Sequence, residues 1–451
     1  MTSIKTFRVD KKVLDTLSAN EKKLLPILVE AAKKIDAIFL LQENPKYQGA
    51  NFYPHDATKA EIEEAAKKNP QILSPFTIVE RENGKLTVVP YNIEYQKLLE
   101  PIAKLLNDAA KICQNKSFRT YLETLSESLI GGSCQKADIA WLGIKNSNLD
   151  IVIGPYERYL DKLFFVKKAY QANVAIIDHA KSEKAKIIRD ILSTTYGPRP
   201  HSVIAPSAID IQVQHCLMIS GLLGRIFFIE QHFPTDTETT EKYGSRILGY
   251  LSAIDYKFQK LIYPIFRTIF EKHFKARYSK DLLEKGNYLY ALLSAIAQQL
   301  HRYRGSRTRL KDLFPALDEA NSVVSGVQHA KHLVLKGVID QKELEAVMIC
   351  QICWMFSEWI NFKSSRTRED FLKGDALTFN FLIREGALQE KEGISWPNFA
   401  KMFFEIENLS AIFSRFLEEG SYREAKEFLT KYLSYENFKA FDKGLSHIKP
   451  L

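Results

Sequence analysis

Apolar residues recur at helical spacing along most of the chain, and strand-like runs gather in its first half. A capping box, Ser18-x-x-Glu21, precedes apolar positions three and four residues apart from Leu24 to Ile38, which predicts an amphipathic helix of about four turns or more. The segment FTIVERENGKLTVVPY predicts a β-hairpin, because Asn83 and Gly84 can adopt the positive φ angles of a type I′ turn.

The two halves of the chain show different periodicity. The runs LDIVIG, NVAIID, IDIQVQ and RIFFIE are strand-like and alternate with helical patterns, which predicts a mixed α and β region. From about Ser245 onward the pattern is helical, with one stripe from Leu248 to Ile269 and another from Leu289 to Leu300. We therefore expect an α+β, predominantly helical fold. A mixed lobe over residues 1–240, which need not be one continuous stretch, precedes a helical lobe over 241–451.

Composition places the chain among ordinary globular proteins. Its 451 residues are 45% hydrophobic, no run approaches the ~20 apolar residues of a membrane span, and the first residues lack the apolar stretch of a signal peptide. We therefore expect a cytoplasmic protein with no membrane partner. The five cysteines form no disulfide framework. Cys350-x-x-Cys353 lies in the apolar run VMICQICWMF, which favours buried helix over a metal or redox site.

The net charge of +9 permits an anionic partner, but no nucleic-acid motif or basic tail is present, so we expect no nucleic-acid partner. Positive charge is concentrated in HRYRGSRTRLK, which carries Arg302, Arg304, Arg307, Arg309 and Lys311. A solvated loop is the ordinary interpretation. If the segment faces a binding cleft, its guanidinium groups suit a carboxylate or a phosphate.

Five segments together resemble one known family: residues 137–172, which contain IGPYERY, ANFYPHDATKAEIE at 50–63, FPTD at 233–236, LFPALDEA at 313–320 and GDALTFNFLIREGA at 374–387. They are similar to the shorter bacterial branch of the dipeptidyl peptidase III family, zinc peptidases that are sometimes fused to a nudix hydrolase domain. The similarity extends to about residue 430, and we expect no nudix domain here. The resemblance implies two lobes, one helical and one mixed with a small barrel, that face each other across a wide peptide-binding cleft.

A zinc peptidase of this family needs two histidines and a general-base glutamate on one helix, and a glutamate ligand on a later helix. By the resemblance, Ser294, Ala295 and Gln298 occupy the positions of the first histidine, the base and the second histidine. With a longer motif spacing, Gln299 would take the last position. None of these residues can serve in the implied role. In addition, none of the ten histidines is followed by glutamate, so the sequence contains no HExxH motif.

The second motif is only partly kept. Glu319 matches the glutamate ligand, but Val323 stands where an acidic residue would orient a ligand histidine. Phe371 stands where the family has a substrate-binding histidine. We therefore expect no bound metal and no cofactor.

Other candidate ligand-binding residues follow from the same resemblance. His232 precedes FPTD, and Thr235 replaces an asparagine that in the family binds the peptide backbone. Glu157, in the GPYERY signature, could bind substrate or brace the fold, and we favour bracing for it and for Asp161. Lys167 and Lys168 are interpreted as exposed helix positions.

Three hypotheses for function follow. The first is a pseudopeptidase that binds a peptide or protein segment in the cleft without zinc-dependent hydrolysis. The second is a metal-independent enzyme that acts on an anionic or amino-acid-derived small molecule there. The third, a zinc peptidase with relocated ligands, would use His329, His332 and Glu319, although the two histidines are more simply ordinary surface or core residues.

Overall fold

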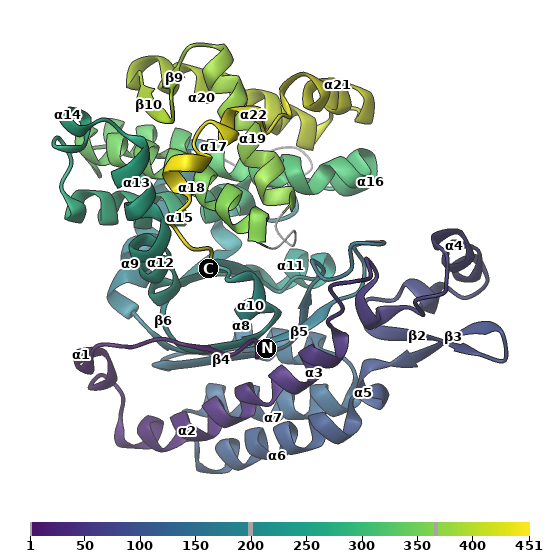
Figure 1. Cartoon of the computed structure of the whole chain (residues 1–451). Coiled ribbons are helices and arrows are strands. Elements are labelled where there is room, and N and C mark those ends of the chain that lie inside the picture. The colour runs from purple at the N-terminus through teal and green to yellow at the C-terminus, as the bar shows by residue number, and fades with distance from the viewer. Residues whose placement is uncertain (1, 197–201, 365–368) are drawn as a thin grey trace. The chain divides into compact units, whose positions relative to one another are not determined.

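The computed structural model describes residues 2–196, 202–364 and 369–451. The chain forms two compact units (Figure 1). Unit 1 comprises Met1–His179, Val213–Phe228 and Phe233–Tyr243, and unit 2 comprises Ala180–Gln212, Ile229–His232 and Gly244–Leu451. The chain therefore passes between the units more than once.

The elements of unit 1 combine a sheet, a hairpin and a set of helices. In chain order they are β1 (Lys5–Thr6), α1 (Lys11–Leu14), α2 (Ala19–Lys33), α3 (Ile35–Gln42), η1 (Ala50–Phe52), α4 (Lys59–Lys68), η2 (Pro70–Leu73), β2 (Thr77–Glu82), β3 (Lys85–Pro90), α5 (Tyr91–Glu94), α6 (Gln96–Ile112), α7 (Lys116–Gly131), α8 (Gln135–Leu142), β4 (Leu149–Glu157), β5 (Ala169–Ile177), α10 (Leu222–Ile226) and α11 (Thr237–Tyr243). Helix α9 (His179–Tyr196) and strands β6 (Ile209–Gly221) and β7 (Glu230–Phe233) cross a unit boundary.

Two local predictions are confirmed. Ser18 and Glu21 form the capping box at the start of α2, and the predicted helix is divided at Lys34 into α2 and α3. Strands β2 and β3 pair as an antiparallel hairpin, and the turn residues Asn83 and Gly84 have φ angles of 50° and 77°. Both signals act within a few residues, so neighbouring elements do not override them.

The main sheet has the strand order β4-β5-β6-β8-β7, and β1 also pairs with β6. In unit 1, β4 and β5 are antiparallel with Ile151 opposite Val174, and both strands are buried on both faces over nearly their whole length. Helices α2, α6 and α7 cover this part of the sheet (Figure 1). The hydroxyl of Tyr121 on α7 donates to the carbonyl oxygen of Ile151 at 2.7 Å, which ties the helix layer to the sheet.

Two predictions of secondary structure are wrong. The run RIFFIE is not a strand: α10 ends at Ile226, Phe227 has a φ of 62°, and strand β7 begins only at Glu230. The segment from Ser245 to Tyr250 is strand β8, so Leu248 belongs to the sheet. Short apolar runs do not distinguish strand from helix, and Ser245–Tyr250 forms a strand between β6 and β7 in the sheet.

Unit 2 is mainly helical. Besides α9 its elements are η3 (Pro206–Ala208), β8 (Ser245–Tyr250), α12 (Leu251–Lys257), the π-helix η4 (Phe258–Ile262), α13 (Tyr263–Ile269), α14 (Lys272–Lys275), α15 (Lys280–Leu300), α16 (Ser306–Leu310), η5 (Lys311–Leu313), α17 (Phe314–Leu335), α18 (Gln341–Ser364), α19 (Glu369–Arg384), β9 (Leu388–Lys391), β10 (Ile394–Pro397), α20 (Phe399–Glu418), α21 (Tyr422–Tyr432), α22 (Glu436–Lys439) and α23 (Asp442–Leu445). The predicted α+β class with a predominance of helix is confirmed.

Glycines set the close helix crossings of unit 2. A Cβ on Gly286 of α15 would lie 2.7 Å from Ala346 of α18. A Cβ on Gly374 of α19 would lie 2.9 Å from the backbone nitrogen of Ala320 on α17. Real Cβ contacts are longer, so these helices approach each other almost backbone to backbone.

Helix α18 is buried along most of its length. Cys350 and Cys353 are fully buried in it, as predicted, and Sγ of Cys350 donates to the carbonyl oxygen of Leu283 at 3.3 Å. Among the described residues, no helix is both long enough and apolar enough to cross a membrane.

Candidate functional site

The positions that the family resemblance assigns to the zinc motif lie where α15 packs on α17. A Cβ on Gly326 of α17 would lie 2.8 Å from both the backbone nitrogen and Oγ of Ser294 on α15. Oγ of Ser294 is buried, and no hydrogen-bond partner for it is found among the described residues. Ala295 is buried and contributes only a methyl group. Ser294 is therefore part of a tight helix crossing, and Ala295 is buried beside it in the chain.

Gln298 lies one turn after Ser294 and reaches the same neighbouring helix. Its Nε2 donates to Oδ2 of Asp318 at 3.5 Å, a long contact. Gln299, the alternative position, is buried.

The residues at this crossing do not fit a zinc ion. A hydroxyl, a methyl and a carboxamide replace two imidazoles and a carboxylate, and zinc in proteins is held by thiolate, imidazole and carboxylate ligands. In the part of the chain that the structure describes, no three His, Cys, Asp or Glu side chains gather in a way that could hold a metal ion.

The later motif lies on α17 but serves other contacts. Glu319 is partly buried, and its charge contributes, after burial, to raising the pKa of Tyr290 on α15. The backbone oxygen of Val323 accepts a hydrogen bond from Nε2 of Gln351 at 3.3 Å. The charge of Glu319 is thus near α15, whose residues Lys280–Leu300 include no histidine.

Asp318 is the centre of a charged cluster in unit 2. Burial raises the pKa of its carboxyl, and the charges of Arg307, Arg302 and His232 act in the opposite direction. Three residues singled out from the sequence, Arg302, Arg307 and His232, are thus brought near one carboxylate, together with Gln298. In unit 2, this charged cluster therefore lies beside the crossing of α15 and α17.

The arginine-rich segment is not a simple solvated loop. It contains helix α16, and Nη2 of Arg309 donates to the carbonyl oxygen of Leu417 at 2.6 Å. Oγ of Ser306 donates to the same oxygen at 2.7 Å, so both cap the C-terminal end of α20. Arg307 lies over the ring of Phe314 at 5.1 Å.

Arg304 and Phe371 lie outside the charged cluster. The side chain of Arg304 is exposed, and its carbonyl oxygen accepts from Nη1 of Arg309 at 3.4 Å. Phe371 is partly buried near the start of α19. The charged groups that shift the pKa of Asp318 are Arg307, Arg302 and His232.

The relocated metal site is not assembled. His329 and Glu319 are ten residues apart on one helix, α17, which corresponds to about 15 Å along a helix axis. His329 is fully buried, and its ring stacks on that of His301 with centroids 5.8 Å apart. His332 is partly exposed. These histidines and Glu319 therefore cannot share one ion.

In unit 1 the structure corrects the interpretation of Lys167 and Lys168, which we expected to be exposed helix positions: both lie outside any helix, just before β5, and both are buried. Lys167 is 0% exposed and Lys168 is 4% exposed, because the chain enters the buried strand β5 directly after them. Nζ of Lys167 donates to Oγ1 of Thr77 at 2.7 Å, and Nζ of Lys168 donates to Oγ1 of Thr235 at 2.8 Å. Burial lowers the pKa of Lys167 to about 7 and that of Lys168 to about 8.

The neighbouring acidic residues of the signature segment have distinct positions. Asp161 accepts hydrogen bonds from four backbone N–H groups, those of Leu163, Phe164, Val166 and Lys167, and so braces the loop before β5. Glu157 ends β4, and its charge partly offsets the lowered pKa of Lys168. Sequence reasoning missed these buried lysines, although their place inside the run FFVKKAYQANVAII was a usable signal.

A second titratable pair missed from the sequence lies nearby in unit 1. The hydroxyl of Tyr156 donates to Oδ1 of Asp138 at 3.1 Å. Burial raises the pKa of Asp138 to about 7. A buried aspartate of this kind cannot be recognised from the helical pattern of α8 alone, because its burial depends on β4.

The comparisons with known proteins agree with this fold. No protein-family model matches the sequence. The structure is similar to that of dipeptidyl peptidase III from Caldithrix abyssi, with a TM-score of 0.84 and 23% identity over 99% of this chain and 96% of that one. It is also similar to dipeptidyl-peptidase III from Corallococcus sp. strain EGB, with a TM-score of 0.81 and 22% identity over 99% and 94% of the chains.

One curated protein matches in sequence. Nudix hydrolase 3 of Arabidopsis thaliana is 23% identical over 476 aligned positions, which cover 94% of this chain and 61% of that protein. The chain thus spans about three fifths of the length of this relative. The resemblance inferred from the sequence is confirmed in the fold, which is that of dipeptidyl peptidase III.

Proposed function

We propose that this chain binds a peptide or protein segment and does not hydrolyse it by zinc chemistry. The proposal is supported by the dipeptidyl peptidase III fold, which spans the whole chain, and by the residues at the zinc-motif positions. It includes a cleft as the binding site and a cytoplasmic location, with no nucleic-acid or membrane partner. Extended peptides bind through main-chain hydrogen bonds that do not require a metal.

One observation carries the proposal. By the family resemblance, Ser294 and Ala295 take the positions of a ligand and the general base; Ser294 lies in the close crossing of α15 with α17 at Gly326, and Ala295 is buried. A side chain as small as that of Ser294 suits the crossing, whereas an imidazole at this position would need space that the neighbouring helix occupies. The packing of these two helices is therefore matched to small residues and not to a metal centre.

The test combines metal analysis, catalysis and binding on the intact chain. Protein purified without chelators is analysed for zinc and assayed for cleavage of a dipeptidyl-arylamide with and without added Zn²⁺. Binding of a hexapeptide with a free amino terminus, Ala-Ala-Val-Phe-Ala-Ala, is measured by calorimetry. We expect substoichiometric zinc, no zinc-dependent cleavage and saturable peptide binding. Stoichiometric zinc with dipeptide release would refute the proposal, and so would the absence of peptide binding.

A second candidate function is supported by the charged cluster around Asp318. Arg302, Arg307 and His232 lie near this carboxylate, so an anionic or amino-acid-derived small molecule could be held there by a metal-independent enzyme. Binding of inorganic phosphate and of free glutamate is compared for wild type, Arg302→Ala and Arg307→Ala. Arg304→Ala is the matched control, because Arg304 is exposed on the same segment and outside the cluster. Equal losses in all three variants would count against this site.

A further inference from the structure

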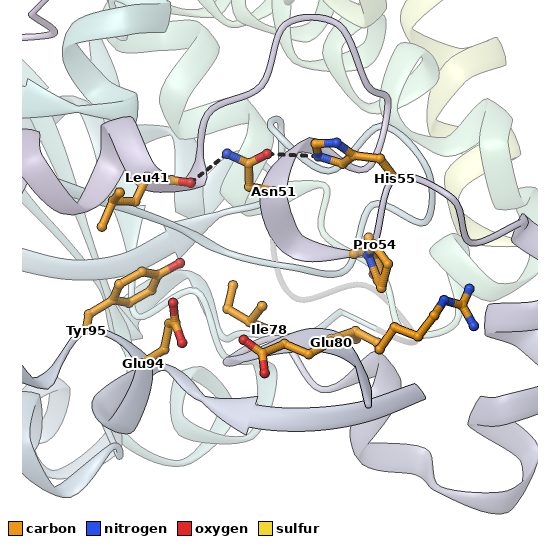
Figure 2. Close-up of a pocket in the computed structure, with 11 residues that line it drawn as sticks. Leu41, Asn51, Pro54, His55, Ile78, Glu80, Glu94 and Tyr95 are labelled. Carbon is orange, nitrogen blue, oxygen red and sulfur yellow. Dashed lines mark hydrogen bonds between the residues drawn. The ribbon is translucent and has the colours of Figure 1, made fainter. Parts of the chain in front are cut away.

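A groove in unit 1 runs beside strand β2 (Figure 2). Its volume is about 450 Å³. The lining residues come from the end of α3, the segment at η1, strand β2 and the end of α5, and they are Leu41, Asn51, Tyr53, Pro54, His55, Ile78, Val79, Glu80, Arg81, Glu94 and Tyr95. All of them belong to one unit, so the groove is complete within it.

One wall of the groove is held in place by the side chain of Asn51. Its Nδ2 donates to the carbonyl oxygen of Leu41 at 2.8 Å, and its Oδ1 lies 3.1 Å from Nε2 of His55, as the dashed lines of Figure 2 show. The hydroxyl of Tyr53 donates to Oδ2 of Asp161 at 3.1 Å. These bonds hold the wall in its shape without a ligand, so an occupant would not have to order it.

The opposite side of the groove follows the main chain of β2. Four consecutive residues, Ile78 to Arg81, line it, although successive side chains of a strand point to opposite faces. Because residues from both faces of β2 line the groove, the groove must run along the edge of this strand. Within the described residues, β2 forms a two-stranded sheet with β3. An edge strand beside a groove is a site where an extended peptide can add a further strand.

The charge that faces the groove is negative. Burial and the charge of Glu80 both raise the pKa of Glu94, which indicates that the two carboxylates repel each other. Arg81 does not compensate them, because its guanidinium is engaged with Glu61 at 2.7 and 2.9 Å and with Asp56 at 2.9 Å. A cation placed between Glu80 and Glu94 would relieve this repulsion.

One exposed apolar side chain, Leu41, lines the groove, and another, Ile93, is adjacent to Glu94 in the chain but outside the lining. Leu41 is 53% exposed and Ile93, next to Glu94 in the chain, is 58% exposed. Leu41 lies across the groove from Glu94 in Figure 2. We propose that the groove binds an extended peptide segment that pairs with β2 and places a lysine or arginine side chain between Glu80 and Glu94, with apolar residues of the segment against Leu41.

The test uses a fluorescein-labelled probe, Val-Lys-Val-Lys-Val with blocked ends, and fluorescence anisotropy with the whole chain at low salt. We expect saturable binding that weakens about fivefold or more in the double variant Glu80→Gln and Glu94→Gln. Glu82→Gln is the matched control, because Glu82 is an exposed carboxylate on the same strand outside the lining, and it should leave affinity unchanged. Equal affinity of the double variant and the wild type would overturn the proposal.

Two further probes test the strand pairing. The same peptide with N-methyl groups on alternate residues cannot donate to β2, so it should bind at least about tenfold more weakly. Lysine amide, which carries the cation without the main chain, should also bind far more weakly. Unchanged affinity for either probe would overturn the proposed mode. Peptide binding elsewhere on the chain would not respond to Glu80 and Glu94, so this test is independent of the function proposed above.

Discussion

Replacing Ser294 with histidine, the residue type that a zinc site would need there, should destabilise unit 2. A Cβ on Gly326 would lie 2.8 Å from Oγ of Ser294 and 2.9 Å from its Cα, so the backbones of α15 and α17 already lie close together. An imidazole has no room beside Gly326 unless the two helices separate. Such a separation would disturb the neighbouring crossing of α15 with α18 at Gly286.

The expected loss can be worked from this geometry. Overfilling a packed interior costs about 1–3 kcal/mol, and burying an imidazole nitrogen without a partner adds about 1–3 kcal/mol. The two costs together lower the expected free energy of unfolding of Ser294→His by about 2–6 kcal/mol. Gln298→His, one turn further on, should cost less than about 1 kcal/mol, because Gln298 is partly exposed and its contact with Asp318 is long.

The assay is urea unfolding followed by tryptophan fluorescence. Trp354, Trp359 and Trp396 belong to unit 2, whereas Trp141 belongs to unit 1, so the signal reports mainly on the unit that carries the substitution. Equal midpoints for Ser294→His and the wild type would refute the tight crossing. A combined Ser294→His, Ala295→Glu and Gln298→His variant that folds and binds one zinc ion would refute the argument that this helix pair is unsuited to the metal.

Three further predictions concern buried contacts. Lys257 and Glu358 form a 2.8 Å ion pair with exposures of 2% and 4%, so Glu358→Gln should cost about 3–5 kcal/mol in urea unfolding, and a loss under about 1 kcal/mol would contradict this. Because the pKa of Asp138 is raised from its usual value near 4 to about 7 in the folded state, its carboxyl is tolerated when protonated at low pH, and the unfolding free energy should fall from about pH 4 to about pH 7 relative to Asp138→Asn. Parallel pH profiles would refute this. Gly374→Ala should destabilise by about 1–3 kcal/mol, whereas Gly131→Ala, which meets nothing within 4 Å, should be neutral or stabilising, and equal effects would contradict the glycine argument.

Local signals predicted local structure well. The capping box at Ser18 and the turn at Asn83 and Gly84 are where the sequence indicated, because both depend on backbone preferences and hydrogen bonds within a few residues. The α+β character of the fold also follows from periodicity. The assignment of RIFFIE as a strand was wrong, since a short apolar run can be buried in either conformation.

The sequence shows which residue types occupy the candidate site, but it does not show what most of them contact. The residue types at Ser294, Ala295 and Gln298 can be read from the chain, but their place at the crossing with Gly326 depends on how α15 packs on α17. Similarly, the charge of the arginine-rich segment is visible in the sequence. The sequence does not show that Arg309 differs in role from the other arginines. Arg309 caps α20 because α16 packs against the end of that helix.

The sequence by itself determined the chemistry that this chain can bring to a site: no histidine-glutamate zinc motif, small residues on the helix that would carry it, and an excess of positive charge. The tertiary structure decided which charges are buried and which are paired. Lys167 and Lys168 became buried because β5 is covered on both faces, and Glu80 and Glu94 came together because a hairpin strand lies beside the end of α5. Burial and the distance between charges depend on residues that are far apart in the sequence, so a local sequence pattern cannot predict them.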